Sequence, residues 1–193
     1  MKPHYPLRAT QFEPHTDDRF AVDALHQRCR FGINAGGRVF IVFCYSRFSD
    51  ADVDHLYRLP SLAIFDRLQF VGQQSGFTEQ GFIAICRLPR LRCLLDQNDS
   101  RLTPACLEAA AENRQLFWLK LPNCGISDAD VSHLRAATHL HSLVLSGNPI
   151  SDASVSILQE LIELRALLLD DTWVSDDAKL ELKTRLPRLR LLK

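Results

Sequence analysis

The stretch Ile126-Ser127-Asp128-Ala129-Asp130-Val131-Ser132-His133-Leu134 opens a segment that the chain repeats 24 residues later. The segment continues to Leu140-x-x-Leu143-x-Leu145-x-x-Asn148, and a second copy begins at Ile150-Ser151-Asp152-Ala153. With Ile126 as position 1, equivalent positions recur at intervals of 29, 25, 24, 24 and 24 residues. They are Phe48, Phe77, Leu102, Ile126, Ile150 and Val174. A fixed period in the twenties predicts a solenoid of stacked repeats.

Each repeat has two halves with different hydrophobic spacing. Positions 1, 6 and 9 are apolar with polar residues between them, which is typical of one face of a helix. The Leu-x-x-Leu-x-Leu half ends in the alternation of a short strand. Because one unit cannot bury its own apolar edge, the repeats are expected to stack around a shared core of leucines.

Two polar positions mark the junction between strand and helix. Position 2 is suited to cap a helix, and an acidic residue usually follows at the positive end of the helix dipole. The position-2 residues are Ser49, Thr78, Thr103, Ser127, Ser151 and Ser175. Two residues before position 1, we expect an inward side chain that binds backbone groups of the turn. These residues are Ser46, Gln73, Asp99, Cys124, Asn148 and Thr172.

Residues 39–193 resemble the leucine-rich repeat family, on the strength of Leu116-x-x-Leu119-x-Leu121-x-x-Cys124 and the matching run from Leu140 to Asn148. The junction at 123–128 is similar to the ribonuclease-inhibitor-like and cysteine-containing subtypes. Thr172-Trp173-Val174-Ser175-Asp176 is close to short bacterial members. The resemblance implies an α/β solenoid of about six units, right-handed and curved. Its parallel sheet would lie on the concave side and its helices on the convex side.

The segment before the repeats is expected to form a flexible arm and a cap. Residues 1–15 have no hydrophobic period and predict the arm. Residues 16–38 predict the cap. Thr16-Asp17-Asp18 is typical of a helix start, and an amphipathic helix over Phe20–Arg30 would turn Val22, Leu25 and Cys29 inward, followed by a β-hairpin at the Asn-Ala-Gly-Gly turn. The first strand of the array is predicted at Val39–Cys44.

Three further strand and helix boundaries follow from the same alignment. The strand of the first repeat is predicted at Arg67–Val71. The last helix should reach about Arg185, and a closing strand should cover Leu186–Leu191.

Composition limits the classes of partner. The 193 residues have a formal net charge of +0, so no overall charge attracts nucleic acid or an anionic membrane. The N-terminus lacks the apolar run of a signal peptide, and no stretch has the roughly 20 apolar residues that span a bilayer. Six cysteines without a C-x-x-C pair favour buried thiols in a reducing cytosol over a disulfide or zinc framework. We therefore expect a cytoplasmic protein.

The outward positions of the strands predict a concave surface that is unusually apolar for a solvent-facing sheet. Contiguous exposed apolar surface usually marks an interaction site, and tryptophan is a frequent hot-spot residue. The alternative is that the N-terminal arm or a second copy of the chain covers this surface. The predicted partner-binding residues are Phe40, Val42, Arg67, Gln69, Leu95, Trp118, Lys120, Val144, Leu168, Asp170 and Arg190.

The most direct interpretation is a non-enzymatic module that binds a protein partner through this face. The sequence has no G-x-S-x-G, no phosphate-cradling glycine loop and no H-E-x-x-H, so we expect no catalytic residue, cofactor or metal. Alternatives are a regulator of an enzyme, by fold-level analogy with ribonuclease inhibitor, and an uncharacterised enzyme. For an F-box adaptor, the first 38 residues are too short. Nucleic acid is an unlikely partner for a neutral chain.

Three features outside this face allow two interpretations each. Trp173 either packs on the neighbouring turn or contacts a partner at the rim. His139 and His141 flank Leu140, but no third metal ligand has a motif spacing. The basic C-terminal run is either a solvated cap or a site for an acidic partner or RNA. This run contains Lys179, Lys183, Arg185, Arg188, Arg190 and Lys193.

Overall fold

The computed structural model describes residues 14–44, 48–67, 76–96 and 102–192. Its strands are β1 (Cys29–Ile33), β2 (Val39–Cys44), β3 (Ile64–Arg67), β4 (Cys93–Asp96), β5 (Trp118–Lys120), β6 (Ser142–Val144), β7 (Ala166–Leu168) and β8 (Arg190–Leu192). Its α-helices are α1 (Thr16–Leu25), α2 (Asp50–Leu56), α3 (Glu79–Cys86), α4 (Pro104–Glu112), α5 (Asp128–Val131), α6 (Val155–Leu158) and α7 (Asp176–Arg185). Two short 3-10 turns, η1 (Ser132–Leu134) and η2 (Asp152–Ser154), extend α5 and precede α6.

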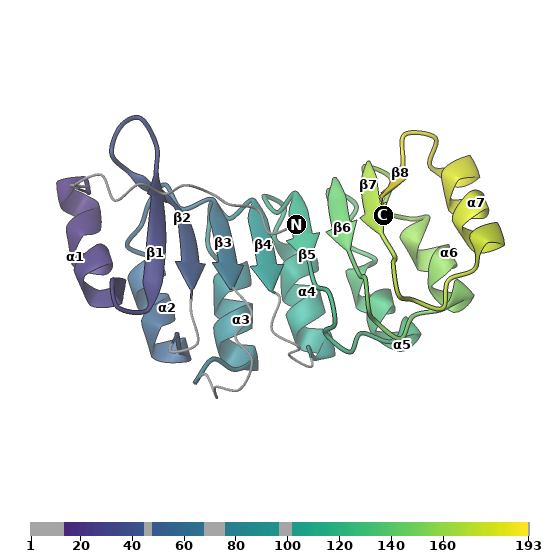
Figure 1. Cartoon of the computed structure of the whole chain (residues 1–193), viewed down its shortest axis with the longest axis horizontal. Coiled ribbons are helices and arrows are strands. Elements are labelled where there is room, and N and C mark those ends of the chain that lie inside the picture. The colour runs from purple at the N-terminus through teal and green to yellow at the C-terminus, as the bar shows by residue number, and fades with distance from the viewer. Residues whose placement is uncertain (1–13, 45–47, 68–75, 97–101, 193) are drawn as a thin grey trace.

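The strands form one sheet in the order of the sequence, from β1 to β8. The hairpin strand β1 is antiparallel to β2, and every later strand pairs in parallel with its predecessor. Figure 1 shows the strands side by side in a single row, and the helices that follow them lie against one face of this row. This arrangement confirms the predicted open α/β solenoid, with the sheet on its concave side.

The core lies between the sheet and the helices. One residue from each strand points into it, and these residues are direct partners across the sheet. This row is Val42, Phe65, Leu94, Leu119, Leu143 and Leu167, all buried. Each buried side chain of this size stabilises the fold by ~1.5–3 kcal/mol, so the array is held mainly by contacts between neighbouring repeats.

The six predicted capping residues all stand directly before a helix or helical turn. Ser49 and Ser127 form capping boxes with the third helical residue, Asp52 or Asp130. The Asp130 carboxylate accepts hydrogen bonds from the backbone N–H and the hydroxyl of Ser127, at 2.8 and 2.5 Å. The helix starts were therefore predictable from capping chemistry alone.

The acidic residue after the cap has a second role in four of the repeats, at Asp50, Glu79, Asp128 and Asp152, which the sequence did not reveal. It accepts hydrogen bonds from the cap of the next repeat. Asp128 accepts from the backbone N–H of Ser151 at 2.8 Å and from its hydroxyl at 2.7 Å. Asp152 binds the same two groups of Ser175 at 2.7 and 2.9 Å, and Asp50 binds those of Thr78. We call this chain of contacts the cap ladder.

The cap ladder predicts acid sensitivity. Burial alone would raise the pKa of Asp128, but hydrogen bonds from Ser151 and Ser154 outweigh it and hold the pKa below the ordinary value. A carboxyl with a lowered folded-state pKa stabilises the fold above its unfolded pKa, and that stabilisation disappears as the pH falls through the folded pKa. We expect Asp128→Asn to lower the melting temperature at pH 6, with the difference from wild type shrinking toward pH 3.

The matched control for this prediction is Asp176→Asn. Asp176 occupies the same position in the last described repeat, but it is fully exposed and makes one ion pair, with Lys179 at 3.7 Å. Its substitution should change the melting temperature little at either pH. Equal effects of the two substitutions would mean that the dipole of the helix, rather than the cap ladder, is the relevant interaction.

Asn148 confirms the predicted inward position in its own repeat, whereas Ser46, Gln73 and Asp99 lie outside the described residues. Its side-chain oxygen accepts from the backbone N–H groups of Cys124 and Ile126, at 2.9 and 3.0 Å. Its amide donates to the carbonyls of Leu121 and Leu145, both at 2.8 Å. One buried side chain thus satisfies four backbone groups in two adjacent turns.

The N-terminal segment agrees with the prediction in kind but not in its boundaries. The hairpin is present, but α1 ends at Leu25, and Cys29 belongs to β1 instead of the predicted Phe20–Arg30 helix. The helix begins at Thr16, as predicted, and buried Asp18 anchors its first turn. Asp18 accepts from the backbone N–H of Val39 at 2.7 Å and from Arg38 at 3.1 Å, which fixes α1 against the hairpin. Residues 1–13 of the predicted arm lie outside the described residues.

Two predicted strands are displaced. The first-repeat strand is Ile64–Arg67 instead of Arg67–Val71, and its core residue is Phe65. Arg67 stands where later repeats have the last leucine of Leu-x-x-Leu-x-Leu, so the pattern there was unrecognisable. The closing strand is β8 (Arg190–Leu192) instead of the predicted Leu186–Leu191. It pairs with β7 so that Arg190 lies opposite Ala166, which keeps the 24-residue spacing of the repeats.

Candidate functional site

The concave face of the sheet carries two rows of outward side chains. The first row joins residues that begin the central strands: Ile64, Cys93, Trp118, Ser142, Ala166 and Arg190. The second row, two residues further along each strand, is Phe43, Asp66, Leu95, Lys120, Val144, Leu168 and Leu192. Trp118 is 58% exposed, while Leu95, Val144 and Leu168 are half-buried. The two rows form a continuous surface with an exposed aromatic side chain near its middle.

Five of the predicted site residues lie on this surface as expected. Leu95, Lys120, Val144 and Leu168 occupy the second row, and Trp118 stands beside them in the first. Asp170 follows β7 and is half-buried.

The structure places the remaining predicted residues differently from the prediction. Val42 is 0% exposed and belongs to the core row, so its predicted outward orientation is wrong. Phe40 is half-buried, and its backbone carbonyl accepts from the N–H of Ala63 at 2.9 Å, so it lies level with the residue before β3 and outside the two rows. Every residue of β2 is apolar, so alternation could not assign its faces. Arg190 lies in the row of Trp118, not in that of Lys120.

Two predicted residues of the first repeat belong to the displaced strand. Arg67 pairs with Cys44 and Asp96 at the end of β3, one position beyond the second row. Gln69 lies outside the described residues.

The chemistry of the concave face favours contact over catalysis. Cys93 is the thiol of the first row, but burial, together with the nearby Asp66 carboxylate, raises its pKa to about 12. A thiol with this pKa is protonated at neutral pH and is a poor nucleophile. Lys120 is the cation of the second row, and Asp66, two strands away in the same row, is buried.

A second set of residues lies where the chain enters the strands, and we call this rim the strand-entry edge. Its defining row is Ala63, Arg92, Phe117, His141 and Arg165, one residue before β3 to β7. Consecutive members are joined by backbone hydrogen bonds, such as Phe117 N–H to Arg92 and His141 N–H to Phe117, at 2.8 and 2.9 Å. The Arg92 guanidinium lies over the Phe117 ring at 4.7 Å, and the His141 ring meets Phe117 edge-on at 4.9 Å.

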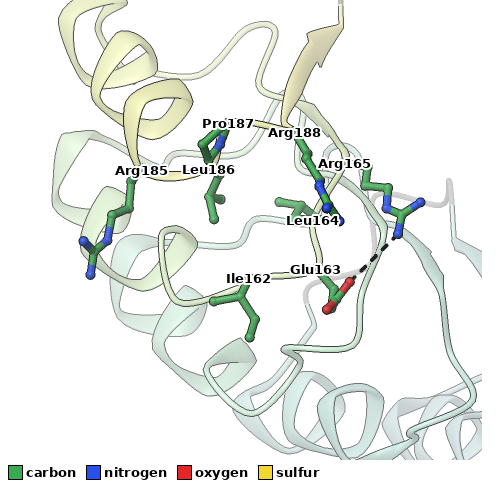
Figure 2. A pocket seen from close by; sticks show the side chains of 8 residues that line it. All are labelled: Ile162, Glu163, Leu164, Arg165, Arg185, Leu186, Pro187 and Arg188. Carbon is green, nitrogen blue, oxygen red and sulfur yellow. Dashed lines mark ion pairs between the residues drawn. The ribbon is translucent and has the colours of Figure 1, made fainter.

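Hollows open along this edge. One lies between the first row and the edge, lined by Ile64, Cys93, Trp118, Arg92, Phe117 and His141. A neighbouring hollow includes Ser61, Arg90 and Gln115. Figure 2 shows a further hollow between the last two repeats, with Arg165, Arg188 and Glu163 near Leu164, and Leu186 beside Pro187 on the other side. Sequence reasoning missed this edge, because it falls between the helical and strand patterns.

The features left open by the sequence can now be placed. The Trp173 side chain is 73% exposed, so it does not pack on the neighbouring turn, although its backbone N–H donates to Ile150 at 2.9 Å. His141 Nδ1 contacts the carbonyl of His139 at 3.0 Å. Burial lowers the pKa of His139, and the charge of Arg114 adds to this effect. Across the described residues, no three potential metal-ligating side chains gather in one place.

None of the helices in the described parts of the chain is both long and apolar enough to cross a bilayer.

No protein-family model matches the sequence, and no curated protein matches it. Solved structures do share its architecture. An internalin (inlF) from Listeria monocytogenes aligns over 75% of this chain and 38% of its own, with a TM-score of 0.54 and 18% identity. Internalin C2 (inlC2) from the same species aligns over 91% of this chain and 81% of its own, with a TM-score of 0.52 and 18% identity. The chain therefore spans well under half of the first of these proteins. The likeness is one of fold.

Proposed function

We propose that this chain, which folds as a leucine-rich-repeat solenoid, is a non-enzymatic module that holds a protein partner against the concave face of its sheet. Extended concave surfaces of this kind are what repeat proteins use for binding. The observation that carries the proposal is the row Leu95, Lys120, Val144 and Leu168 beside exposed Trp118. An apolar surface with an aromatic side chain at its centre is the usual composition of a binding hot spot.

The neighbourhood of Trp118 explains why it would anchor a partner. Its ring stands at the mouth of the hollow formed with Cys93 and Phe117. A partner side chain placed there would be removed from water on several sides. Burial of this kind is what concentrates binding energy in a few residues. The cytosol stays our predicted compartment for this interaction, on the grounds of the cysteine content alone.

An affinity pull-down from native lysate tests the proposal. We expect the wild type to retain a protein that Trp118→Ala and Leu168→Glu lose, with at least a tenfold reduction for the tryptophan variant. Trp173→Ala is the matched control, since Trp173 is even more exposed but lies in a turn outside the two rows. Retention by both concave-face variants, or equal loss with Trp173→Ala, would contradict the assignment of this face.

A further inference from the structure

The neutral net charge of the chain conceals a separation of charge between its two edges. The loops that lead into β3 to β8 cover residues 57–63, 87–92, 113–117, 135–141, 159–165 and 186–189. They contain the arginines Arg58, Arg87, Arg90, Arg92, Arg114, Arg135, Arg165 and Arg188, against the acids Glu160 and Glu163. The opposite edge, where helices begin, is acidic. Its residues include Asp50, Asp52, Glu79, Asp128, Asp130, Asp152, Asp170, Asp171, Asp176 and Asp177.

Fold stability explains the acidic edge but not the basic one. Apart from Asp170 and Asp171, these acids lie in the first turn of a helix, and several of them form the cap ladder. Cations are favourable only within the last turn of a helix, yet Arg92 comes six residues after the end of α3, and Arg165 seven residues after α6. Arg135 is paired with Glu160 at 3.0 Å and Arg165 with Glu163 at 4.0 Å. Within the described part of the chain, no carboxylate forms an ion pair with Arg90 or Arg92.

The position of Arg92 joins this charge to the concave face. Its guanidinium is held over the Phe117 ring, and both residues line the hollow that Trp118 also lines. Arg90 lines the adjoining hollow, together with Arg92. Trp118 therefore shares its hollow with Arg92, and Arg90 lines the adjoining hollow; neither arginine has an acidic ion-pair partner among the described residues. Guanidinium groups suit carboxylates particularly well, because they donate in a planar fork.

We propose that the hollow between Trp118 and Arg92 receives an acidic peptide segment of the partner, with an apolar side chain against Trp118 and carboxylates at Arg90 and Arg92. This inference rests on the proposed function and assigns the chemistry of the bound segment. A polyanionic nucleic acid fits less well. Its phosphates would need a continuous basic track, whereas Arg135 and Arg165 on this edge are already paired with Glu160 and Glu163, and Asp170 and Asp171 follow β7 at the opposite edge.

The test uses the full chain as bait in a selection from a random 12-residue peptide display library. We expect enriched peptides to carry aspartate or glutamate next to an aromatic or aliphatic residue. A labelled peptide of this type should lose at least tenfold in affinity with Arg92→Glu and with Trp118→Ala, and less with Arg92→Gln. Its affinity should also fall when NaCl is raised from about 50 to 500 mM, since exposed charges are screened.

The matched control is Arg135→Glu, which reverses a charge on the same edge at a residue outside both hollows. It should leave the affinity within twofold of wild type, and each variant should retain the wild-type circular dichroism spectrum. Peptides that depend on Trp118 but carry no acids, or that ignore Arg92→Glu, would overturn this inference while leaving the concave face as the binding surface. Enriched peptides that bind Trp118→Ala as well as wild type would instead count against the proposed function.

Two further outcomes would identify a ligand of this hollow other than an acidic peptide. A labelled 12-nucleotide poly(U) that binds more tightly than the selected peptides and is lost with Arg92→Glu would identify a nucleic-acid site. Self-association in sedimentation experiments that disappears with Arg92→Glu would identify a second copy of the chain. Either result overturns the proposal for an acidic peptide.

Discussion

Replacing Asn148 with leucine should lower the free energy of unfolding by roughly 3–5 kcal/mol, because each buried backbone group left without a partner costs about 1–3 kcal/mol. The substitution removes hydrogen bonds to the N–H groups of Cys124 and Ile126 and to the carbonyls of Leu121 and Leu145. Asn148 itself is buried, so water cannot easily take over these contacts. Urea denaturation followed by circular dichroism measures the loss.

The control for Asn148 is its counterpart in the next repeat. Thr172 makes one comparable hydrogen bond, from its hydroxyl to the carbonyl of Leu169 at 2.7 Å. Thr172→Val should therefore cost about 1 kcal/mol, the typical net contribution of one hydrogen bond. If the two variants were equally stable, Asn148 would be filling space rather than connecting adjacent turns.

Truncating Leu143 to alanine should lower the free energy of unfolding by about 2–5 kcal/mol, the range measured for large-to-small core substitutions. Leu143 is fully buried between Leu119 and Leu167 in the core row. Its shortened side chain would leave a cavity that both neighbouring repeats border. The change affects two interfaces between repeats at once, which adds to the effect of the lost apolar burial.

Val144, the next residue, provides the control because it faces the other way. It is half-buried on the concave face, and Val144→Ala should cost less than about 1 kcal/mol, close to the range for surface substitutions. The comparison is valid only if both variants unfold in a single transition with the same urea dependence. Similar losses for the two would contradict the assignment of the inward and outward rows.

The sequence predicted the fold best where local chemistry and repeat spacing agree. From Leu116 onward, leucine spacing, cap serines and the 24-residue period all give the same register, and the outward positions of Trp118, Val144 and Leu168 followed directly. The first repeats lack this agreement. Arg67 and Asp96 replace the last leucine of the pattern, and β2 is apolar at every position, so its two faces carry the same signal.

The strand-entry edge shows a different limit of sequence reasoning. Arg92, Phe117 and His141 are 24 or 25 residues apart and belong to no motif. Their contact depends on strand pairing, which brings equivalent positions of successive repeats together. Net charge concealed the edge as well, since the 23 basic and 23 acidic residues of the whole chain cancel. The net charge of the chain therefore gave no sign of the acidic partner that the arginines of this edge suggest.

The cap ladder gives the array a direction. Each acid is supplied by one repeat and used by the repeat that follows it, as Asp128 serves Ser151 and Asp152 serves Ser175. During synthesis the acidic acceptor leaves the ribosome before the cap residue that donates to it. Each completed repeat therefore already carries the carboxylate that binds the first residue of the next helix. Loss of a repeat at the C-terminal side leaves behind a solvated carboxylate, whereas loss at the N-terminal side leaves a helix start without its acceptor. The solenoid is thereby suited to grow from its N-terminal cap and to fray from its other end.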